Sequence, residues 1–290
     1  MSQKEQFLFE VYVDIYTESG LLKYVHKSTA NQGGSLDIEF SLPFDNSSDQ
    51  STGEVTIWNM SRVSANRIHQ GDRVQIRAGY RNDIGIIFDG HIFRTTIPNF
   101  EDADQQYILR VVEGNEYRRN KDIKLTFGEG TNARTIINKI TQKSGINLNI
   151  ISMKENHVYK EGYSVDGSPF DALSEVAEDC HSALYYRRGQ LTLRYMYDGN
   201  NTGTWQLNNG TGMISSPVME RRDDDWLKSE DNDGNGRYQY SVDSILNYRI
   251  TTGEYVHIKS TFVDVNGTVI SGEHSFDGTS PTTSLEIGVQ

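Results

Sequence analysis

The stretch Gly71-Asp72-Arg73-Val74-Gln75-Ile76-Arg77 decides the fold, because the chain contains its pattern twice. A shift of 182 residues without a gap places it on Gly253-Glu254-Tyr255-Val256-His257-Ile258-Lys259. Both stretches read glycine, acid, any residue, Val, any residue, Ile, base. The Val and the Ile lie two residues apart, so they point to one face of a strand, and the glycine permits the backbone angles of a tight turn.

The same shift pairs residues beyond this stretch. It places Ile68 on Ile250, Tyr80 on Phe262, Gly85 on Gly267, Ile87 on Val269 and Gly90 on Gly272. Two hairpins rich in β-branched residues can align by chance. Here glycines, core positions and terminal charges match together, which favours one β-hairpin module present twice.

Strand patterns surround the first copy. Residues Phe7 to Ile15 alternate with a period of two, which indicates a half-buried strand. Short strand-like runs follow at Leu36 to Leu42, Glu54 to Trp58, Arg73 to Tyr80, Gly85 to Phe93 and Gln106 to Val112. One short helix that bridges two strands is expected over Ser61 to His69, where Val63 and Ile68 suit it. Residues 1–117 are therefore predicted to form an all-β sandwich or barrel.

The middle, residues 118–200, changes character and shows helical spacing twice. Thr131 is expected to cap a helix that Gly145 terminates, and Ser168 to cap a second one with Pro169 at its first position. The apolar positions are Ala133, Ile136, Ile137 and Ile140 in the first helix, and Leu173, Val176, Ala177 and Cys180 in the second. Strands are predicted after each: Ile146 to Ile150, then a hairpin of Ala183 to Tyr186 and Leu191 to Tyr195 around Arg188 and Gly189.

Strand patterns return from Thr202 and are interrupted by a polar stretch, Ser229 to Gly236, which we expect to be a loop. Residues 201–290 are predicted to form a second β domain. The predicted fold class is mainly β with a small α+β middle, in which two tail-tube-like β-barrel or sandwich domains flank two helix-strand units.

Composition excludes several classes of protein. The 290 residues carry a formal charge of −12, with two acidic ends around a slightly basic middle. This balance argues against specific nucleic-acid binding, which depends on Lys and Arg at phosphates. The single cysteine, Cys180, cannot close an intramolecular disulfide. No apolar run reaches the roughly 20 residues of a membrane helix, and Met1 to Gln6 does not begin a secretory signal.

No catalytic, cofactor-binding or metal-binding residue is assigned. The seven histidines are scattered and form no HExxH motif; they are His26, His69, His91, His157, His181, His257 and His274. Cys180 and His181 are adjacent on the second predicted helix, so their side chains diverge by about 100° and cannot form a nucleophile-base pair. The runs Asp223 to Asp225 and Glu230 to Gly234 lack the order of an EF-hand loop.

Two further groups of residues have a structural interpretation. Arg118, Arg119, Lys121, Arg187 and Arg188 are expected to lie on a solvated face rather than in a docking patch. Core burial is the default for Trp58, Trp205 and Trp226, and packing at domain or subunit contacts is the alternative.

Several short stretches together resemble the baseplate hub proteins of tailed phages, a family related to the first part of type VI secretion spikes. They are Gly53 to Ser61, Gly71 to Tyr80, Phe88 to Gly90, Gly212 to Pro217, Ser244 to Asn247 and Gly272 to His274. The resemblance covers nearly the whole chain, although each motif is short and apolar.

The resemblance implies a homotrimer in the tail baseplate of a virion, assembled in the host cytoplasm. Its two tube-like domains would form a pseudo-hexameric ring that joins the tail tube protein to a threefold spike or tail-tip protein. The tape-measure protein and baseplate wedge proteins would be further partners, and DNA would pass through the ring during genome ejection. Secretion spikes continue into a needle, whereas this chain stops at Gln290, so the spike is expected to be a separate chain.

Three copies of a chain with two β modules present six similar modules, which fits this expectation because soluble oligomers favour closed rotational symmetry. A net negative inner surface would let DNA slide through without adhering, although acidic residues also serve solubility alone. Two rivals remain: a hexameric distal tail protein, which needs only one module per chain, and a tail-associated cell-wall-active enzyme that uses paired carboxylates.

Overall fold

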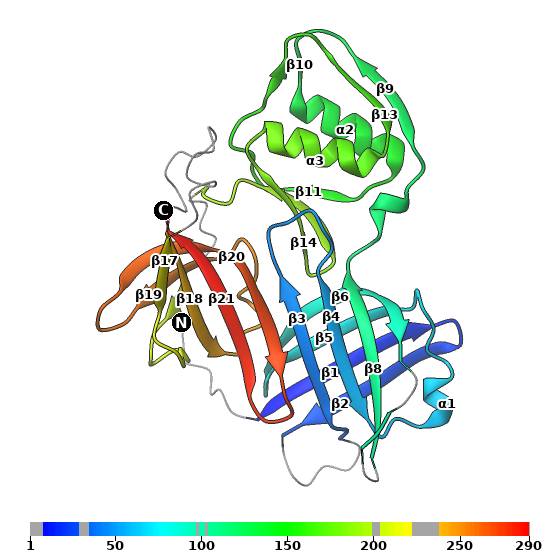
Figure 1. Ribbon diagram of the computed structural model, residues 1–290, viewed down its shortest axis with the longest axis vertical. Helices are drawn as coiled ribbons and strands as arrows, with labels where there is room; N and C mark the ends of the chain where they lie inside the picture. Colours follow the sequence, from blue (N-terminus) through cyan, green and yellow to red (C-terminus); the bar gives the residue numbers. More distant parts are fainter. Residues whose placement is uncertain are drawn as a thin grey trace.

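A computed structural model describes residues 8–28, 35–96, 99–101, 104–198, 204–221 and 238–289. Most of the described residues lie in strands, as Figure 1 shows, and the predicted mainly β fold with a small α+β middle is confirmed. The polar stretch Ser229 to Gly236, the acidic runs Asp223 to Asp225 and Glu230 to Gly234, and Trp226 lie outside the described residues.

The described residues of the first module form eight strands and one short helix. They are β1 (Phe9–Thr17), β2 (Gly20–Lys27), β3 (Ile38–Phe44), β4 (Thr52–Trp58), α1 (Arg62–Ala65), β5 (Arg73–Tyr80), β6 (Asp83–Thr95), β7 (Asn99–Glu101) and β8 (Asp104–Glu113). The alternation that predicted β1 buries Val11, Val13 and Ile15 completely. Strand β2 was not predicted; it pairs antiparallel with β1 through the hairpin at Gly20.

The second module contains β16 (Trp205–Leu207), β17 (Val218–Arg221), β18 (Tyr238–Ile245), β19 (Tyr255–Lys259), β20 (Asp264–Phe276) and β21 (Pro281–Val289). Strand β20 pairs with β3, which joins the two modules into one sheet with the order β17-β18-β21-β20-β3-β4-β8-β6-β5-β1-β2. The path is open, and the described strands form no closed barrel.

The duplicated hairpin is present, and its turn is built twice in the same way. Gly71 and Gly253 both have positive φ, at 94° and 81°. The Gly71 N–H donates to the Ile92 carbonyl at 2.7 Å, and the Gly253 N–H donates to the Val269 carbonyl at 2.9 Å. Ile92 and Val269 each donate back to the residue after the glycine, both at 2.9 Å.

The returning strand requires a correction to the ungapped alignment. Val74 pairs with Gly90, sixteen residues later, whereas Val256 pairs with Gly267, only eleven residues later. The equivalent of Gly90 is therefore Gly267 and not Gly272, because the second hairpin is five residues shorter. Equivalent residues of the two modules are therefore 182 positions apart through the first strand of the hairpin and 177 positions apart on its second strand.

The equivalence extends across four strands. In the first module the order is β4-β8-β6-β5, and in the second it is β18-β21-β20-β19. A β-bulge interrupts β6 against β8 between Ile92 and Arg94, and the corresponding bulge interrupts β20 against β21 between Val269 and Ser271. Bulges re-aim a strand at a specific position, so a shared bulge indicates two copies of one module.

The middle segment lies above the two modules in Figure 1 and has a core of its own. Its elements are η1 (Tyr117–Arg119), β9 (Ile123–Phe127), β10 (Thr131–Asn132), α2 (Ala133–Ser144), β11 (Leu148–Ile150), β12 (Val158–Tyr159), β13 (Tyr163–Gly167), α3 (Pro169–Asp179), β14 (Ala183–Arg187) and β15 (Gln190–Arg194). Both predicted helices and the predicted hairpin are present, and the predicted apolar positions of both helices are buried.

Three local predictions were wrong. Asn132, not Thr131, caps α2: its side chain accepts from the Thr135 N–H at 3.0 Å, while Thr131 pairs with Tyr159 in a short strand. His181 is not helical, because α3 ends at Asp179 with Cys180 as its C-cap. The helix expected over Ser61 to His69 extends only over the four residues of α1, and Val63 is 76% exposed.

Candidate functional site

The joint between the two modules is a strand pairing. Strand β3 pairs antiparallel with the second half of β20, with Phe44 opposite Gly272 and Phe40 opposite Phe276. Phe44 is 5% exposed, and it packs in the core of the second module with Ile250 although it belongs to a strand of the first. A Cβ at Gly272 would come within 2.7 Å of the Phe44 ring, so glycine is required for this close approach.

Two strand edges related to this joint have no strand partner among the described residues. Strand β17 ends the sheet path, and all four of its side chains are exposed, including Val218 at 56% and Met219 at 57%. The last part of β6 pairs with β8 through Thr95 but is paired with β5 only as far as His91. Unpaired edges are templates for adding another strand.

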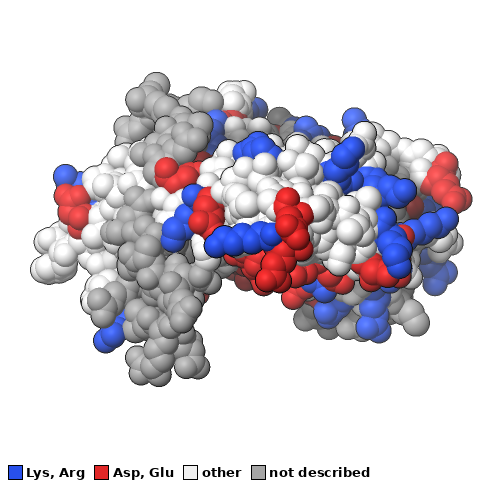
Figure 2. Space-filling view, turned by 90° about the horizontal axis from the view of Figure 1, so that it is seen from above, with Lys and Arg blue, Asp and Glu red and all other residues white. Residues whose placement is uncertain are grey.

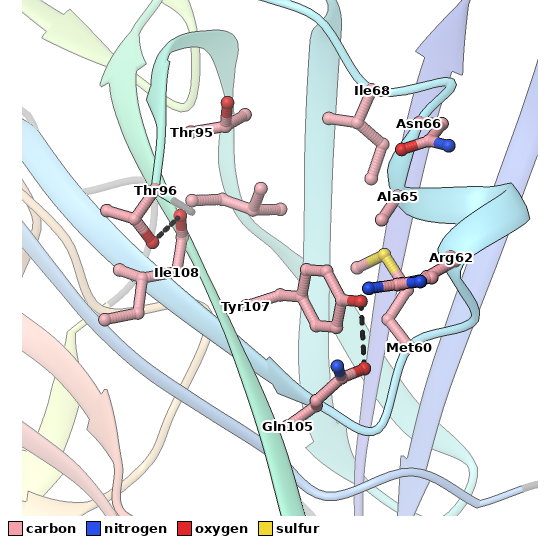
Figure 3. A pocket seen from close by; sticks show the side chains of 11 residues that line it. Met60, Arg62, Ala65, Asn66, Ile68, Thr95, Thr96, Gln105, Tyr107 and Ile108 are labelled. Carbon is pink, nitrogen blue, oxygen red and sulfur yellow. Dashed lines mark hydrogen bonds between the residues drawn. The ribbon is translucent and has the colours of Figure 1, made fainter. Parts of the chain in front are cut away.

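A cavity of about 510 Å³ opens beside this end of β6 (Figure 3). It is lined by Met60, Arg62, Ala65, Asn66, Ile68, Thr95, Thr96, Gln105, Tyr107, Ile108 and Leu109. The Tyr107 hydroxyl donates to Gln105 Oε1 at 3.1 Å, and Thr96 Oγ1 donates to the Ile108 carbonyl at 3.2 Å. The lining contains no carboxylate, histidine or cysteine, so it offers no acid/base pair.

The turn of the β14–β15 hairpin is inserted where the middle segment meets both modules. Arg188 and Gly189 have φ of 50° and 83°, the left-handed pair of a two-residue hairpin turn. The Gly189 N–H donates to Glu113 Oε1 of the first module at 3.0 Å. The Arg188 guanidinium donates to the Tyr248 and Arg249 carbonyls of the second module, at 2.6 and 3.0 Å.

Ion pairs surround this turn. Arg187 pairs with Glu254, a residue of the duplicated motif, and Trp205 Nε1 donates to the other oxygen of that carboxylate at 3.1 Å. Arg249 pairs with Asp83, which links the second module directly to β6 of the first, with one N–O distance of 2.8 Å. Arg187 and Arg188 were expected on a solvated face; instead both are part-buried in this junction.

Burial shifts the protonation of two groups near the joints. Desolvation raises the pKa of Glu113, which is 4% exposed, to about 7, despite hydrogen bonds from Gly189 and Arg188 that favour its charged form. Desolvation also lowers the pKa of His274 to about 3. His274 is 1% exposed, pairs with Thr283 Oγ1 at 2.9 Å and packs against the Phe44 ring.

The other residues weighed in the sequence form no further site among the described residues. Within the described ranges, no group of three or more His, Cys, Asp and Glu side chains could hold a metal ion. Cys180 is buried, and burial raises the pKa of its thiol. Trp58 and Trp205 are both part-buried, and each donates to a carboxylate; Trp205 also packs against the core of the second module.

Charge on the face seen in Figure 2 is mixed. Lys and Arg side chains lie among Asp and Glu side chains there, without a large area of one sign. Among the described helices, none has the length and apolar character needed to cross a membrane.

Comparison with known proteins identifies the fold. No protein-family model and no curated protein sequence matches the chain. Solved structures do match. A tail protein from Neisseria meningitidis has a TM-score of 0.65 at 9% identity, covering 96% of each chain. The 43 kDa tail protein of prophage MuSo2 from Shewanella oneidensis has a TM-score of 0.65 at 8% identity, covering 96% of this chain and 98% of that one.

A third structure connects the fold to secretion. It is an Escherichia coli component of the type VI secretion system, described as similar to the T4 bacteriophage tail proteins gp27 and gp5. Its TM-score is 0.64 at 8% identity, covering 89% of this chain and 75% of that one. The resemblance noted in the sequence is thus confirmed at the level of structure: the chain has the fold of phage tail proteins and of this type VI secretion component.

Proposed function

We propose that this protein is a structural baseplate hub, a homotrimer whose two β modules per chain form a pseudo-hexameric ring. The ring joins the sixfold tail tube to a threefold spike in the virion. The single observation that carries the proposal is the shared module: four strands in the same order, with the same turn and the same bulge, occur twice in one chain.

Symmetry explains why duplication suits this role. A homotrimer has three identical surfaces, whereas a sixfold ring requires six, and closed rings form when each subunit meets the next through the same interface. A chain with two equivalent modules supplies six from three copies. A hexameric distal tail protein would not need the second module, so the duplication favours the hub over this rival.

The remaining parts of the proposal concern partners. One face of the ring would contact the tail tube protein, and the other a separate spike or tail-tip protein, with wedge proteins outside and the tape-measure protein within. DNA would pass through the centre, where a net negative lining would keep it from adhering. The chain would assemble in the host cytoplasm and act without catalysis.

Mass and symmetry test the proposal. Native mass spectrometry of the purified full chain is expected to give three times the chain mass of 32.9 kDa. Class averages from electron microscopy are expected to show a ring with six similar lobes. Six copies would support the distal tail protein, a single copy would contradict both, and cell-wall hydrolysis abolished by one Asp or Glu substitution would support the enzyme.

A further inference from the structure

We propose that β17 of one chain adds as a strand to the free end of β6 in a second copy of the chain, with Arg221 opposite Thr95 and Glu220 opposite Thr96. This inference rests on the proposed trimeric ring and names the interface that closes it. It follows from the internal symmetry of the chain, because the described structure already contains one joint of this kind.

The first step is that β3 and β17 occupy equivalent places. Rows of directly opposed residues can be followed across each module. In the first module one row is Ser41, Glu54, Arg110 and Arg94, and in the second the corresponding row is Val218, Ser241, Glu286 and Ser271. Each row ends at the first paired residue after the shared bulge, Arg94 in β6 and Ser271 in β20. Val218 of β17 is therefore the equivalent of Ser41 of β3, and Arg221 is the equivalent of Phe44.

The second step is that β6 and β20 are equivalent, which places Thr95 on Gly272 and Thr96 on Glu273. Within one chain β3 pairs with this part of β20, with Phe44 opposite Gly272 and Pro43 opposite Glu273. A ring of six equivalent joints requires the same pairing between β17 and the next chain's β6. Transferring the register gives Arg221 opposite Thr95 and Glu220 opposite Thr96.

The cavity of Figure 3 supports the same position independently. In the second module Phe44 belongs to the same buried core as Ile250, and its ring lies against Gly272. The equivalents in the first module are Ile68 and Thr95, and both line the cavity. The first module thus has a cavity at the position where Phe44 of β3 packs in the second module. The occupant by equivalence is Arg221, and the lining offers it the Tyr107 ring and Gln105 Oε1, partners that suit a guanidinium.

Exposure agrees with strand addition by a copy of this chain. Leu42, which is buried at 2% in β3, has Met219 as its equivalent, and Met219 is 57% exposed in the single chain. An exposed methionine and valine on an unpaired edge are features of an interface rather than of a free surface. Main-chain hydrogen bonds would supply affinity, and the side chains at the cavity would fix the register.

Disulfide crosslinking tests the register. In the double variant Arg221→Cys/Thr95→Cys, directly opposed Cβ atoms lie about 5 Å apart, near the range of a disulfide. Mild oxidation is expected to give a covalent trimer on non-reducing gels.

Met219→Cys/Thr95→Cys is the matched control, because a two-residue offset puts the Cβ atoms about 7 Å apart and should reduce trimer yield at least about tenfold. Cys180 is buried and stays in all variants, and each single-cysteine variant should give no covalent trimer.

A second variant measures the interface without crosslinks. Met219→Asp places a charge where the joint would bury it and is expected to weaken trimer association at least about tenfold. Val63→Asp, on the exposed face of α1, is the matched control and should leave association unchanged.

The outcomes separate the two proposals. If native mass gives a trimer but the registered cysteine pair crosslinks no better than the offset pair, or Met219→Asp leaves the trimer intact, this interface is wrong and the hub proposal stands. If the chain is a monomer, both are wrong.

Discussion

Glu113 is a carboxylate almost completely removed from water. It ends β8, is nearly inaccessible to solvent, and accepts a hydrogen bond from the turn of the middle segment. A raised pKa in the folded state means that the folded chain binds a proton that the unfolded chain has released. Stability associated with this group is therefore present below its unfolded pKa of 4.5 and is lost as the pH rises to about 7.

Replacing this carboxylate by its neutral isostere should remove that loss. In Glu113→Gln the amide oxygen can still accept from the Gly189 N–H, so we expect the free energy of unfolding at pH 8 to increase by about 3 kcal/mol relative to the wild type. At pH 4.5 the two proteins should be nearly equal. Urea unfolding at both values measures the difference, and a variant that is less stable at pH 8 would show that the ionised form is the favoured one.

His274 gives the opposite dependence. Its folded pKa of about 3 lies below the ordinary value of 6.5, so stability is present above pH 6.5 and is lost as the pH falls toward 3. His274→Gln keeps a polar partner for Thr283 and cannot titrate. On going from pH 8 to pH 5, the wild type should lose about 2 kcal/mol relative to this variant. Parallel unfolding curves at the two pH values would contradict the buried neutral imidazole.

At the scale of elements, sequence periodicity predicted the helices, hairpins and turns that depend on residues close together in the chain. The two helices, the hairpin around Arg188 and Gly189, and the turns at Gly71 and Gly253 depend on residues a few positions apart. The junction could not be predicted, because Arg188 and its acceptors lie 60 and 61 residues apart. The five-residue difference between the two hairpins could not be predicted either. Each returning strand carries two glycines five residues apart, so the sequence offers Val74 and Val256 a glycine partner in either register.

The cap of α2 is an element-scale prediction. Asn132 accepts from the Thr135 backbone N–H, whereas Thr131 lies outside the helix and donates to the Gly128 carbonyl. We expect Asn132→Ala to lower the free energy of unfolding by about 1 kcal/mol, the usual cost of losing an N-cap. Thr131→Ala is the matched control and should cost clearly less. Chemical denaturation compares the free energies of unfolding of the two variants. Equal losses would contradict the assignment of Asn132 as the N-cap.

For the whole molecule, the joint between the modules determines how it unfolds. Strand β3 pairs with β4 on one side and with β20 on the other, so the two β modules share one continuous sheet. The middle segment instead packs its own core, which includes Leu173. Its polar contacts to the modules include those at the β14–β15 hairpin, the Ser174–Ser48 hydrogen bond and the Arg118–Asp49 ion pair. We therefore expect the two modules to unfold as one cooperative unit.

Two core truncations distinguish this arrangement from three independent units. Phe44→Ala removes a first-module ring from the second-module core and should cost about 3–5 kcal/mol, lowering the transition that carries both modules. Leu173→Ala should cost about 2–5 kcal/mol in the middle segment. Differential scanning calorimetry of each variant, with hydrogen exchange to assign each transition, makes the comparison. Exchange that rises in only one module of Phe44→Ala would mean that the shared sheet does not couple them, because a continuous sheet transmits the loss of the joint to both sides.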